Sequence, residues 1–427
     1  MSLAQEHTPL IVTDNATSPP ARRNAALIAV LSLIMSLCLF ANTFAVYAEG
    51  LYFTSHQYNF ALFYPVMCIV LYGGIALCHS PSRAFMAYDW TNWRVYGPIG
   101  LLFSINYVFL LVASSYVANL FQIIFTQLPL VYTFFLNKYL LKSTFKSEQN
   151  VVLSIAILVN LLLIGNEVSF TNSVFWNLFW QLVFILGGVG AALGNILTEA
   201  YFKSIHHPSA NPTTSEILHF ELAKILVLNV VSNLYSLVGT FMFIYVVYPI
   251  EGIISLQDLA SSNLWSEHSW TFYTFSTGSV LATIAQTVLF RYTSVTYTLV
   301  FANVAGALQV VLVSLPIGDL QQTSSPTQYM IYAILTVLSC MYAYFQVGVD
   351  SEEQHANQQS SRLVRYYAAL HRLYRTCDSN AQINHDADNA DTLADAHASV
   401  RFMTRFLIVF IAVVIALTLP LSFFVKQ

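Results

Sequence analysis

Residues 174–202 read VFWNLFWQLVFILGGVGAALGNILTEAYF, and this stretch indicates the class of the fold. A helix needs about 20 apolar residues to cross a bilayer, and this run is long enough, with Glu199 as its one charged side chain. In lipid the backbone must satisfy its own hydrogen bonds, so such a segment crosses as a helix. Similar runs recur along the chain, at 24–47, 56–79, 94–113, 118–137, 150–166, 216–248, 270–290, 294–315, 328–348 and 405–425.

The composition and the placement of charge indicate a polytopic membrane protein. Of the 427 residues, 56% are hydrophobic and 9% are charged, whereas soluble domains usually have about 25% charged residues. Lys and Arg gather in alternate connections between the apolar runs. By the positive-inside rule, this pattern predicts a cytosolic N-terminus and, after eleven spans, a non-cytosolic C-terminus. The cations are Arg22, Arg23, Arg83, Arg94, Lys138, Lys142, Lys146, Lys203, Arg291, Arg362, Arg365, Arg372, Arg375, Arg401 and Arg405.

The first ten spans divide into two halves, 24–166 and 174–348. Because five is an odd number, two sets of five spans have opposite orientations, which predicts an inverted repeat with the substrate site at its interface. The predicted fold is therefore an all-α polytopic membrane protein: a ten-helix bundle of two inverted five-helix repeats, plus an eleventh transmembrane helix at 405–425. Residues 1–23 are a cytosolic tail.

The cytosolic connection at 349–404 divides into two parts. Residues 361–375 place Leu363, Tyr367 and Leu370 at helical spacing among arginines, which predicts an amphipathic helix on the membrane surface. A helix that binds a protein partner is the alternative. The part from Asp378 to His397 is rich in Asp, Asn, Ala and His, which predicts a disordered linker.

Five short motifs occur in order along the first ten spans. They are Gln122-Ile-Ile-Phe-Thr-Gln127-Leu128-Pro129, Glu167-Val-Ser-Phe170, Asn195-Ile-Leu-Thr-Glu199-Ala-Tyr-Phe-Lys203, Thr296-Tyr297-Thr298-Leu-Val300 and Gly318-Asp319. Their order and spacing resemble the chloroquine-resistance-transporter-like family of the drug/metabolite transporter superfamily. The resemblance implies ten spans and secondary transport of amino acids, short peptides, thiols or cationic drugs across vacuolar, lysosomal or plastid membranes. The connection Tyr248–Ser269 departs from the parasite members, because it lacks their cysteines.

Polar side chains inside the spans are the candidate substrate-binding groups. Such groups are costly in a bundle, so they tend to face its interior or a water-filled cavity. Neutral amides and phenols can donate and accept without fixing a charge preference, which suits a zwitterionic or amide-bearing solute. The alternative is that they bond neighbouring helices. The candidates are Asn42, Asn106, Tyr107, Gln122, Gln127, Asn195, Thr198, Gln286 and Asn303.

Ionisable groups in spans six and seven are the candidate proton-coupling residues. Glu199 and Lys203 lie four residues apart and can pair along one helix face, so a structural ion pair is the alternative to a proton site. In span seven, Glu221 and Lys224 lie three residues apart. His219 could titrate in an acidic compartment. We therefore predict that Glu199, His219, Glu221 and Lys224 contribute to coupling.

The N-terminal tail contains Glu6-His-Thr-Pro-Leu10-Ile11. An acidic residue four positions before a Leu-Ile pair resembles the dileucine signal that clathrin adaptors read for delivery to endosomes and lysosomes. Glu6, Leu10 and Ile11 therefore predict an adaptor as a partner and an endolysosomal membrane as the location.

Other function classes fit less well. A nucleotide-sugar or organophosphate exchanger, the first alternative, needs cations in its cavity, and Lys224 is the one cation placed inside a span. No Asp lies well inside a span and no HExxH spacing exists, so we expect neither an enzyme nor a metal or cofactor. A receptor or scaffold that signals through 349–404 is the second alternative. No nucleotide-binding loop or nucleic-acid partner is indicated. The sequence thus predicts a secondary transporter of small organic solutes in an acidic vacuolar or lysosomal membrane.

Overall fold

The computed structural model describes residues 21–48, 57–79, 90–114, 128–141, 145, 147–167, 174–204, 214–242, 269–302, 326–347, 364, 367 and 405. These residues are helical apart from Leu141, Phe145, Thr293 and Ser294, and they include no β-strand. The all-α class is therefore confirmed for this part of the chain. Its helices are α1 (Ala21–Ala48), α3 (Gln57–His79), α5 (Trp90–Ser114), α7 (Leu128–Leu140), α8 (Ser147–Glu167), α9 (Val174–Ser204), α10 (Thr214–Met242), α12 (Ser269–Tyr292) and α14 (Pro326–Val347). A further helical stretch covers residues 295–302.

Several helices are long and apolar enough to lie in a membrane. Three stretches meet the length and composition needed to cross one: Leu62–His79 in α3, Phe179–Ser204 in α9 and Leu222–Met242 in α10. Large aliphatic side chains also face outward, including Leu33 on α1, Val238 on α10 and Val337 on α14. Apolar surface spread over several helices suits lipid and is rare on soluble monomers. The chain is therefore a helical membrane protein.

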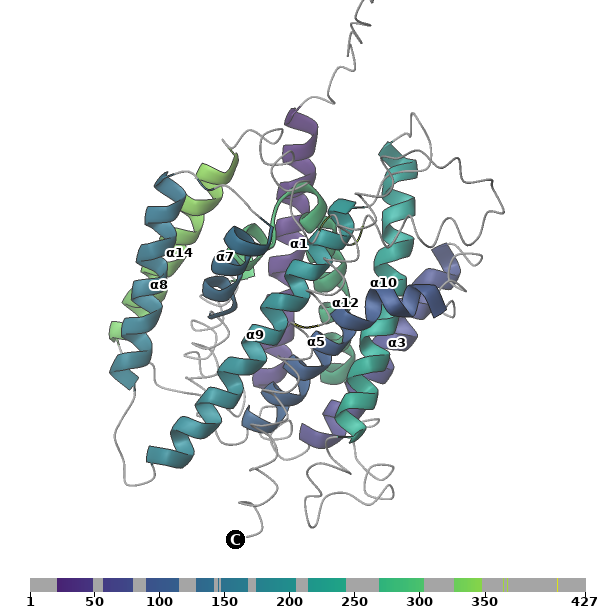
Figure 1. The fold of residues 1–427 in the computed structure, drawn as a ribbon, viewed down its shortest axis with the longest axis horizontal. Coiled ribbons are helices and arrows are strands. Elements are labelled where there is room, and N and C mark those ends of the chain that lie inside the picture. Colours follow the sequence, from purple (N-terminus) through teal and green to yellow (C-terminus); the bar gives the residue numbers. More distant parts are fainter. Residues whose placement is uncertain are drawn as a thin grey trace, which may run out of the picture.

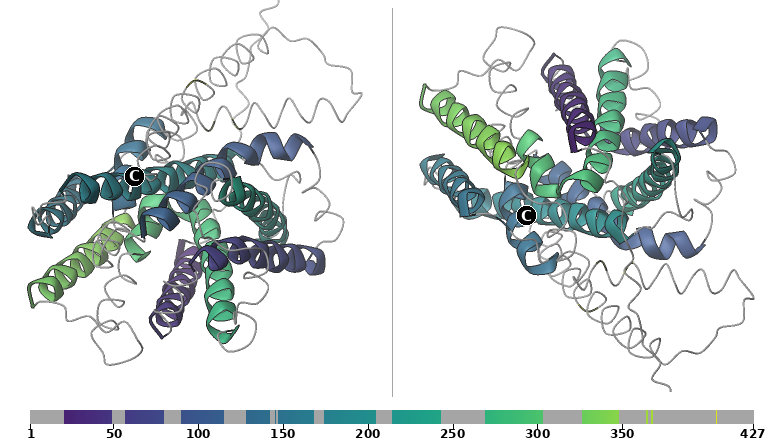
Figure 2. Two further views of the ribbon diagram at one scale, coloured as in Figure 1. Left: turned by 90° about the horizontal axis from the view of Figure 1, so that it is seen from below. Right: turned by 90° about the horizontal axis from the view of Figure 1, so that it is seen from above.

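The described helices pack as a bundle whose main contacts join distant parts of the chain (Figure 1). Helix α1 lies along α12, α5 packs against both α9 and α10, and α3 packs against α10. Helices α8 and α14 pair on the side of the molecule away from α3 and α10, as the end-on views also show (Figure 2). The extensive contacts of α5, α9, α10 and α12 place the middle of the bundle between these elements.

Glycine permits the closest helix contacts. A Cβ atom at Gly190 of α9 would lie 3.0 Å from the Leu102 carbonyl oxygen of α5. A Cβ atom at Gly278 of α12 would meet the Asn42 side chain and would lie 3.2 Å from the Cys38 carbonyl oxygen of α1. Small residues let helix backbones approach closely in membranes, where van der Waals packing rather than the hydrophobic effect drives helix association. These two positions explain why the α5–α9 and α1–α12 pairs are tight.

The helix bounds agree with the predicted spans where both can be compared. Helix α3 covers Gln57–His79 against a predicted 56–79, and α9 covers Val174–Ser204 against 174–202. The described part of the fourth span begins at Leu128, so the N-terminal half of that prediction lies outside the described residues. Residues 1–20 of the predicted tail and, apart from Arg405, the eleventh span also lie outside the described residues, whereas residues 21–23 of that tail form the start of α1.

Candidate functional site

A polar cavity of about 290 Å³ lies within the bundle. Helices α3, α5, α9, α10 and α12 all contribute to its wall, and on each helix the lining residues recur at helical spacing on one face. The lining residues that the structure describes are Tyr64, Pro65, Cys68, Tyr72, Phe103, Asn106, Tyr107, Asn195, Thr198, Leu228, Asn229, Ser232, Asn233, Ser236, Thr283, Gln286, Thr287 and Phe290.

Five of the predicted substrate-binding residues share this cavity: Asn106, Tyr107, Asn195, Thr198 and Gln286. They come from α5, α9 and α12, which are far apart in the sequence. The Thr198 hydroxyl donates to the Gly194 carbonyl one turn earlier, at 2.7 Å, so its own helix satisfies the donor. Its oxygen can still accept a second hydrogen bond.

The other predicted substrate-binding residues lie elsewhere. Asn42 is not among the described lining residues, and a hydrogen bond of 2.9 Å links its amide to the Ser279 hydroxyl at the α1–α12 contact. This position matches the alternative of a polar bond between neighbouring helices. Gln122, Gln127 and Asn303 lie outside the described residues.

The sequence interpretation missed two faces of the cavity. One is the polar stripe of α10, which we define as Asn229, Ser232, Asn233 and Ser236. These residues recur at i, i+3, i+4 and i+7 in the apolar part of the span, beyond Lys224. That spacing could have identified the stripe from the sequence. The other face is the row Tyr64, Cys68 and Tyr72 on α3. A tyrosine row in an apolar helix resembles ordinary core, so its sequence carries little signal.

Aromatic rings form the apolar part of the wall. The Tyr64 ring of α3 stacks on the Tyr107 ring of α5 with centroids 5.8 Å apart and an angle of 25° between the planes. Phe275 of α12 meets the Tyr64 ring edge-on, with a centroid distance of 5.4 Å. Offset stacking and edge-to-face contact are the preferred aromatic geometries, so this corner is a rigid surface.

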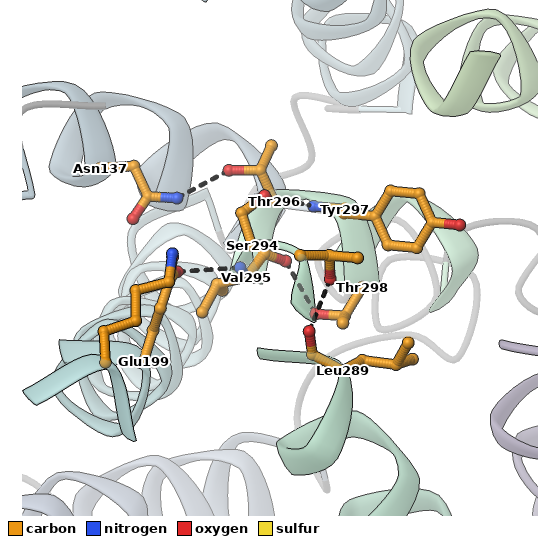
Figure 3. Close-up of polar contacts among 10 residues, drawn as sticks. Asn137, Glu199, Leu289, Ser294, Val295, Thr296, Tyr297 and Thr298 are labelled. Carbon is orange, nitrogen blue, oxygen red and sulfur yellow. Dashed lines mark hydrogen bonds and ion pairs between the residues drawn. The ribbon is translucent and has the colours of Figure 1, made fainter. Parts of the chain in front are cut away.

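Glu199 lies one residue beyond the cavity-lining Thr198, in a second polar centre (Figure 3). The side chain is fully buried, and one carboxylate oxygen pairs with the ammonium group of Lys203. The other oxygen accepts a hydrogen bond of 2.9 Å from the backbone N–H of Val295. Val295 begins the helical stretch 295–302, and the first N–H groups of a helix have no partner within it. Glu199 therefore ties the end of α9 to the start of this stretch.

Two further contacts fix the same junction. The Ser294 hydroxyl accepts a hydrogen bond of 3.2 Å from the Tyr297 N–H, which is the N-cap interaction of the stretch 295–302. The Asn137 side-chain N–H of α7 donates to the Thr296 hydroxyl at 2.8 Å (Figure 3). Glu199 thus has a structural role in this geometry, whether or not it also exchanges a proton.

The remaining predicted coupling residues lie on α10. His219 and Glu221 fall in its first turns, and their side chains lie outside the described part of the chain. Lys224 is partly buried, with its ammonium nitrogen 6.0 Å from the centroid of the Tyr201 ring of α9. This distance is within the range of a cation–π contact. Lys224 is not among the described residues that line the cavity.

A tyrosine cluster, which we define as Tyr96, Tyr201 and Tyr367, lies next to the cavity. The hydroxyl groups of Tyr96 and Tyr201 are 2.9 Å apart, and the rings of Tyr201 and Tyr367 meet edge-on with centroids 5.7 Å apart. These residues belong to a buried cluster that also contains Leu228 and contacts Phe103, both of which line the cavity. The tyrosine cluster therefore packs behind the part of the wall that Leu228 and Phe103 form.

The environment of Tyr367 differs from the membrane surface that we expected for the segment 361–375. Both described residues of that segment, Val364 and Tyr367, are buried against protein, at 4% and 1% exposure. A large aromatic side chain loses contact with water equally well in lipid or in a protein core, so amphipathic spacing alone does not distinguish the two. The rest of the segment lies outside the described residues.

Among the described residues, no group of His, Cys, Asp and Glu side chains is arranged to hold a metal ion. The chain matches no known protein-family model, and no match is found among curated proteins. The geometry of the cavity and of its surroundings therefore carries the functional conclusion.

Proposed function

We propose that the protein is a secondary transporter that moves small organic solutes by alternating access. The observation that carries this proposal is the cavity itself. Its lining combines many polar side chains with aromatic ones, it lies among the helices of an apolar bundle, and both halves of the chain line it. A polar interior of this kind is costly in a membrane protein unless it serves a solute or ion pathway.

The helix contacts support the proposed inverted repeat. The repeat would exchange α1 with α9, α3 with α10, α5 with α12, and α8 with α14. Under this exchange the α1–α12 contact corresponds to the α5–α9 contact, while the α3–α10 and α8–α14 contacts each correspond to themselves. All four are prominent contacts of the bundle.

The largest departure from this symmetry is in one pair of contacts. The α5–α10 contact is extensive, whereas its counterpart between α3 and α12 is slight. In an inverted repeat, two such unequal contacts are expected to interchange when the cavity opens to the other side of the membrane. We therefore propose that α5 and α10 separate, and that α3 and α12 close, during transport.

The proposed setting follows from the resemblance to chloroquine-resistance-transporter-like proteins. The expected cargo is an amino acid, short peptide, thiol or cationic drug. The expected location is an acidic vacuolar or lysosomal membrane, reached through the signal at Glu6, Leu10 and Ile11. A proton gradient would drive transport, with Glu199 and Lys224 among the coupling groups. The organophosphate alternative has less support, because the described lining of the cavity contains no cation.

Uptake into proteoliposomes tests the proposal. The purified protein should accumulate at least one class from a labelled panel of amino acids, peptides and thiols, and an imposed pH gradient should increase that uptake. Protein-free liposomes and protein inactivated by heat are the controls. Absence of uptake by folded protein, for every class in the panel, would contradict the proposal.

A further inference from the structure

We propose that the solute has no net charge and that the polar stripe of α10 (Asn229, Ser232, Asn233 and Ser236) is its main hydrogen-bonding surface. This inference rests on the proposed transport function and narrows its substrate class. Among the expected cargoes it favours neutral amino acids and neutral peptides, and it excludes cationic drugs and anionic thiols.

The first observation is the absence of charge around the cavity. None of its described lining residues is Asp, Glu, Lys, Arg or His. The parts of these helices that include the lining residues, 57–78, 95–114, 174–198, 225–242 and 269–290, carry no such residue either, whereas the remaining parts of α9 and α10 contain Glu199 and Lys224. An ion that leaves water without a counter-charge loses several kcal/mol or more. A net charge on the solute would therefore oppose binding here.

Glu199 and Lys224, which lie close in sequence to the lining residues of α9 and α10, have contacts of their own. The Glu199 carboxylate follows Thr198 in sequence, but it is fully buried between Lys203 and the Val295 N–H. The Lys224 ammonium group lies over the Tyr201 ring. Recruiting the Glu199 carboxylate to a solute would break its buried ion pair with Lys203, which costs about 3–5 kcal/mol.

The second observation is the hydrogen-bonding pattern of the polar stripe. The Asn229 side-chain N–H donates to the Ile225 carbonyl at 2.8 Å, and the Asn233 side-chain N–H donates to the Asn229 carbonyl at 2.8 Å. The Ser236 hydroxyl donates to the Ser232 carbonyl at 3.1 Å. Each of these bonds uses one donor within α10, so the side-chain oxygens remain as acceptors, while each Asn side chain has a second N–H and the Ser232 hydroxyl can also donate. The stripe thus suits a neutral solute that presents both N–H or O–H groups and carbonyl oxygens.

Two buried polar atoms of the wall add to this pattern. The Ser232 hydroxyl oxygen and, on α5, the Asn106 side-chain oxygen are buried and have no hydrogen-bond partner among the described residues. Buried polar groups are nearly always satisfied, so an exception calls for a specific role. Both residues line the cavity, where a solute N–H or O–H group could reach them after small side-chain movements.

The size of the cavity favours a small solute. A volume of about 290 Å³ is close to the lower end of small-molecule sites, which begin at roughly 300 Å³. Its apolar side is the stacked pair Tyr64 and Tyr107. The site therefore fits a small solute with one apolar face and several amide, amine or hydroxyl groups.

Matched dipeptides test the inference in proteoliposomes. Alanyl-glutamine, alanyl-glutamate and alanyl-lysine have similar sizes but net charges of about zero, minus one and plus one at neutral pH. We expect alanyl-glutamine to be taken up at least tenfold more efficiently than the other two. The Asn229→Asp variant places a carboxylate of nearly the same size in the stripe, and its preference should shift toward alanyl-lysine by about tenfold. Asn233→Asp provides a second variant of the same kind if Asn229→Asp does not fold.

The control is Asn150→Asp, the same substitution on α8 outside the described cavity lining, where the amide contacts the Phe145 carbonyl at 3.4 Å. It should leave the preference unchanged. Equal or better uptake of a charged dipeptide by the wild type overturns the inference but leaves the transport proposal standing. An unchanged preference in every folded stripe variant overturns the role of α10. No uptake of any amino acid, peptide or thiol by folded protein overturns both proposals.

Discussion

Replacing Glu199 by Gln should strongly destabilise the protein, because it leaves a buried cation without its partner. Glu199 is 0% exposed, and the side chain of Lys203 is 5% exposed. Removing one member of a buried ion pair costs about 3–5 kcal/mol, since the desolvated charge that remains is uncompensated. Gln keeps the shape and an oxygen that can still accept from the Val295 N–H, so the loss should come mainly from the unpaired ammonium group.

The reciprocal variant and the double variant complete a thermodynamic cycle. Lys203→Met leaves the carboxylate with the Val295 N–H, at 2.9 Å, as a remaining donor. A hydrogen bond to a charged group contributes about 1.5–3 kcal/mol, so this variant should be less destabilised than Glu199→Gln. In the double variant no buried charge is unpaired, and its stability should lie within about 2 kcal/mol of the wild type.

Reversible unfolding in detergent or bicelles measures these free energies. The cycle should give a coupling energy of roughly 3 kcal/mol, which residues in direct contact can reach. Glu148→Gln is the control, since Glu148 is exposed at the start of α8 and its replacement should change stability by less than about 0.5 kcal/mol. Losses below about 1 kcal/mol for both single variants, or additive losses in the double variant, would refute this reasoning.

The double variant also separates stability from coupling. If Glu199 exchanges a proton during transport, the folded double variant should still exchange solute at equal pH but should lose the stimulation by a pH gradient. Retained stimulation would assign Glu199 to structure alone and would direct attention to His219 and Glu221.

Three further predictions concern packing and access to the cavity. An ideal Cβ atom at Gly239 lies 3.4 Å from the Ser104 Cβ atom, which is close enough for a disulfide bond between α5 and α10 in the double variant Ser104→Cys/Gly239→Cys. Oxidation of this variant should stop solute uptake, and reduction should restore it. Full uptake by the cross-linked protein would contradict the proposed separation of α5 and α10. Gly190→Val places a Cβ atom 3.0 Å from an α5 backbone oxygen and should lower the unfolding free energy by about 1–3 kcal/mol, measured by reversible unfolding in detergent or bicelles. Unchanged stability would argue against the close α5–α9 contact. Tyr367→Ala removes part of the tyrosine cluster, so water-soluble reagents should enter the cavity more easily. The reaction of the cavity-lining Cys68, which is 1% exposed, with a water-soluble maleimide should therefore become faster, as measured by mass spectrometry. An unchanged reaction rate would show that Tyr367 does not restrict access to the cavity.

Helix class and span positions were predictable because they depend on local properties. The apolar run at 174–202 is longer than the roughly 20 residues that a helix needs to cross the bilayer, and α9 covers Val174–Ser204. The pairing of Glu199 with Lys203 was also accessible, since residues four apart on a helix are neighbours in any surroundings. Its second contact, with the Val295 N–H, joins residues far apart in the chain and left no pattern in the sequence.

The polar residues show where sequence reasoning stops. Asn42 and Asn106 both lie in apolar spans and have the same side chain, yet Asn106 lines the cavity whereas Asn42 bonds Ser279 between α1 and α12. The difference arises from the rotation of each helix about its axis, which its neighbours determine. Asn106 and Tyr107 of α5 were predicted from the sequence and the polar stripe of α10 was readable as a periodic pattern, but the row Tyr64, Cys68 and Tyr72 of α3 carried little signal.

The sequence by itself determined the helical class and the location of the apolar spans. These properties follow from composition and period along one segment at a time. Tertiary structure decided which polar residues share a cavity, where Glu199 finds its second partner, and that Tyr367 packs on protein rather than on a membrane surface. The reason is physical: a side chain's surroundings depend on how helices rotate and cross, and those angles result from packing between segments that are distant in the chain.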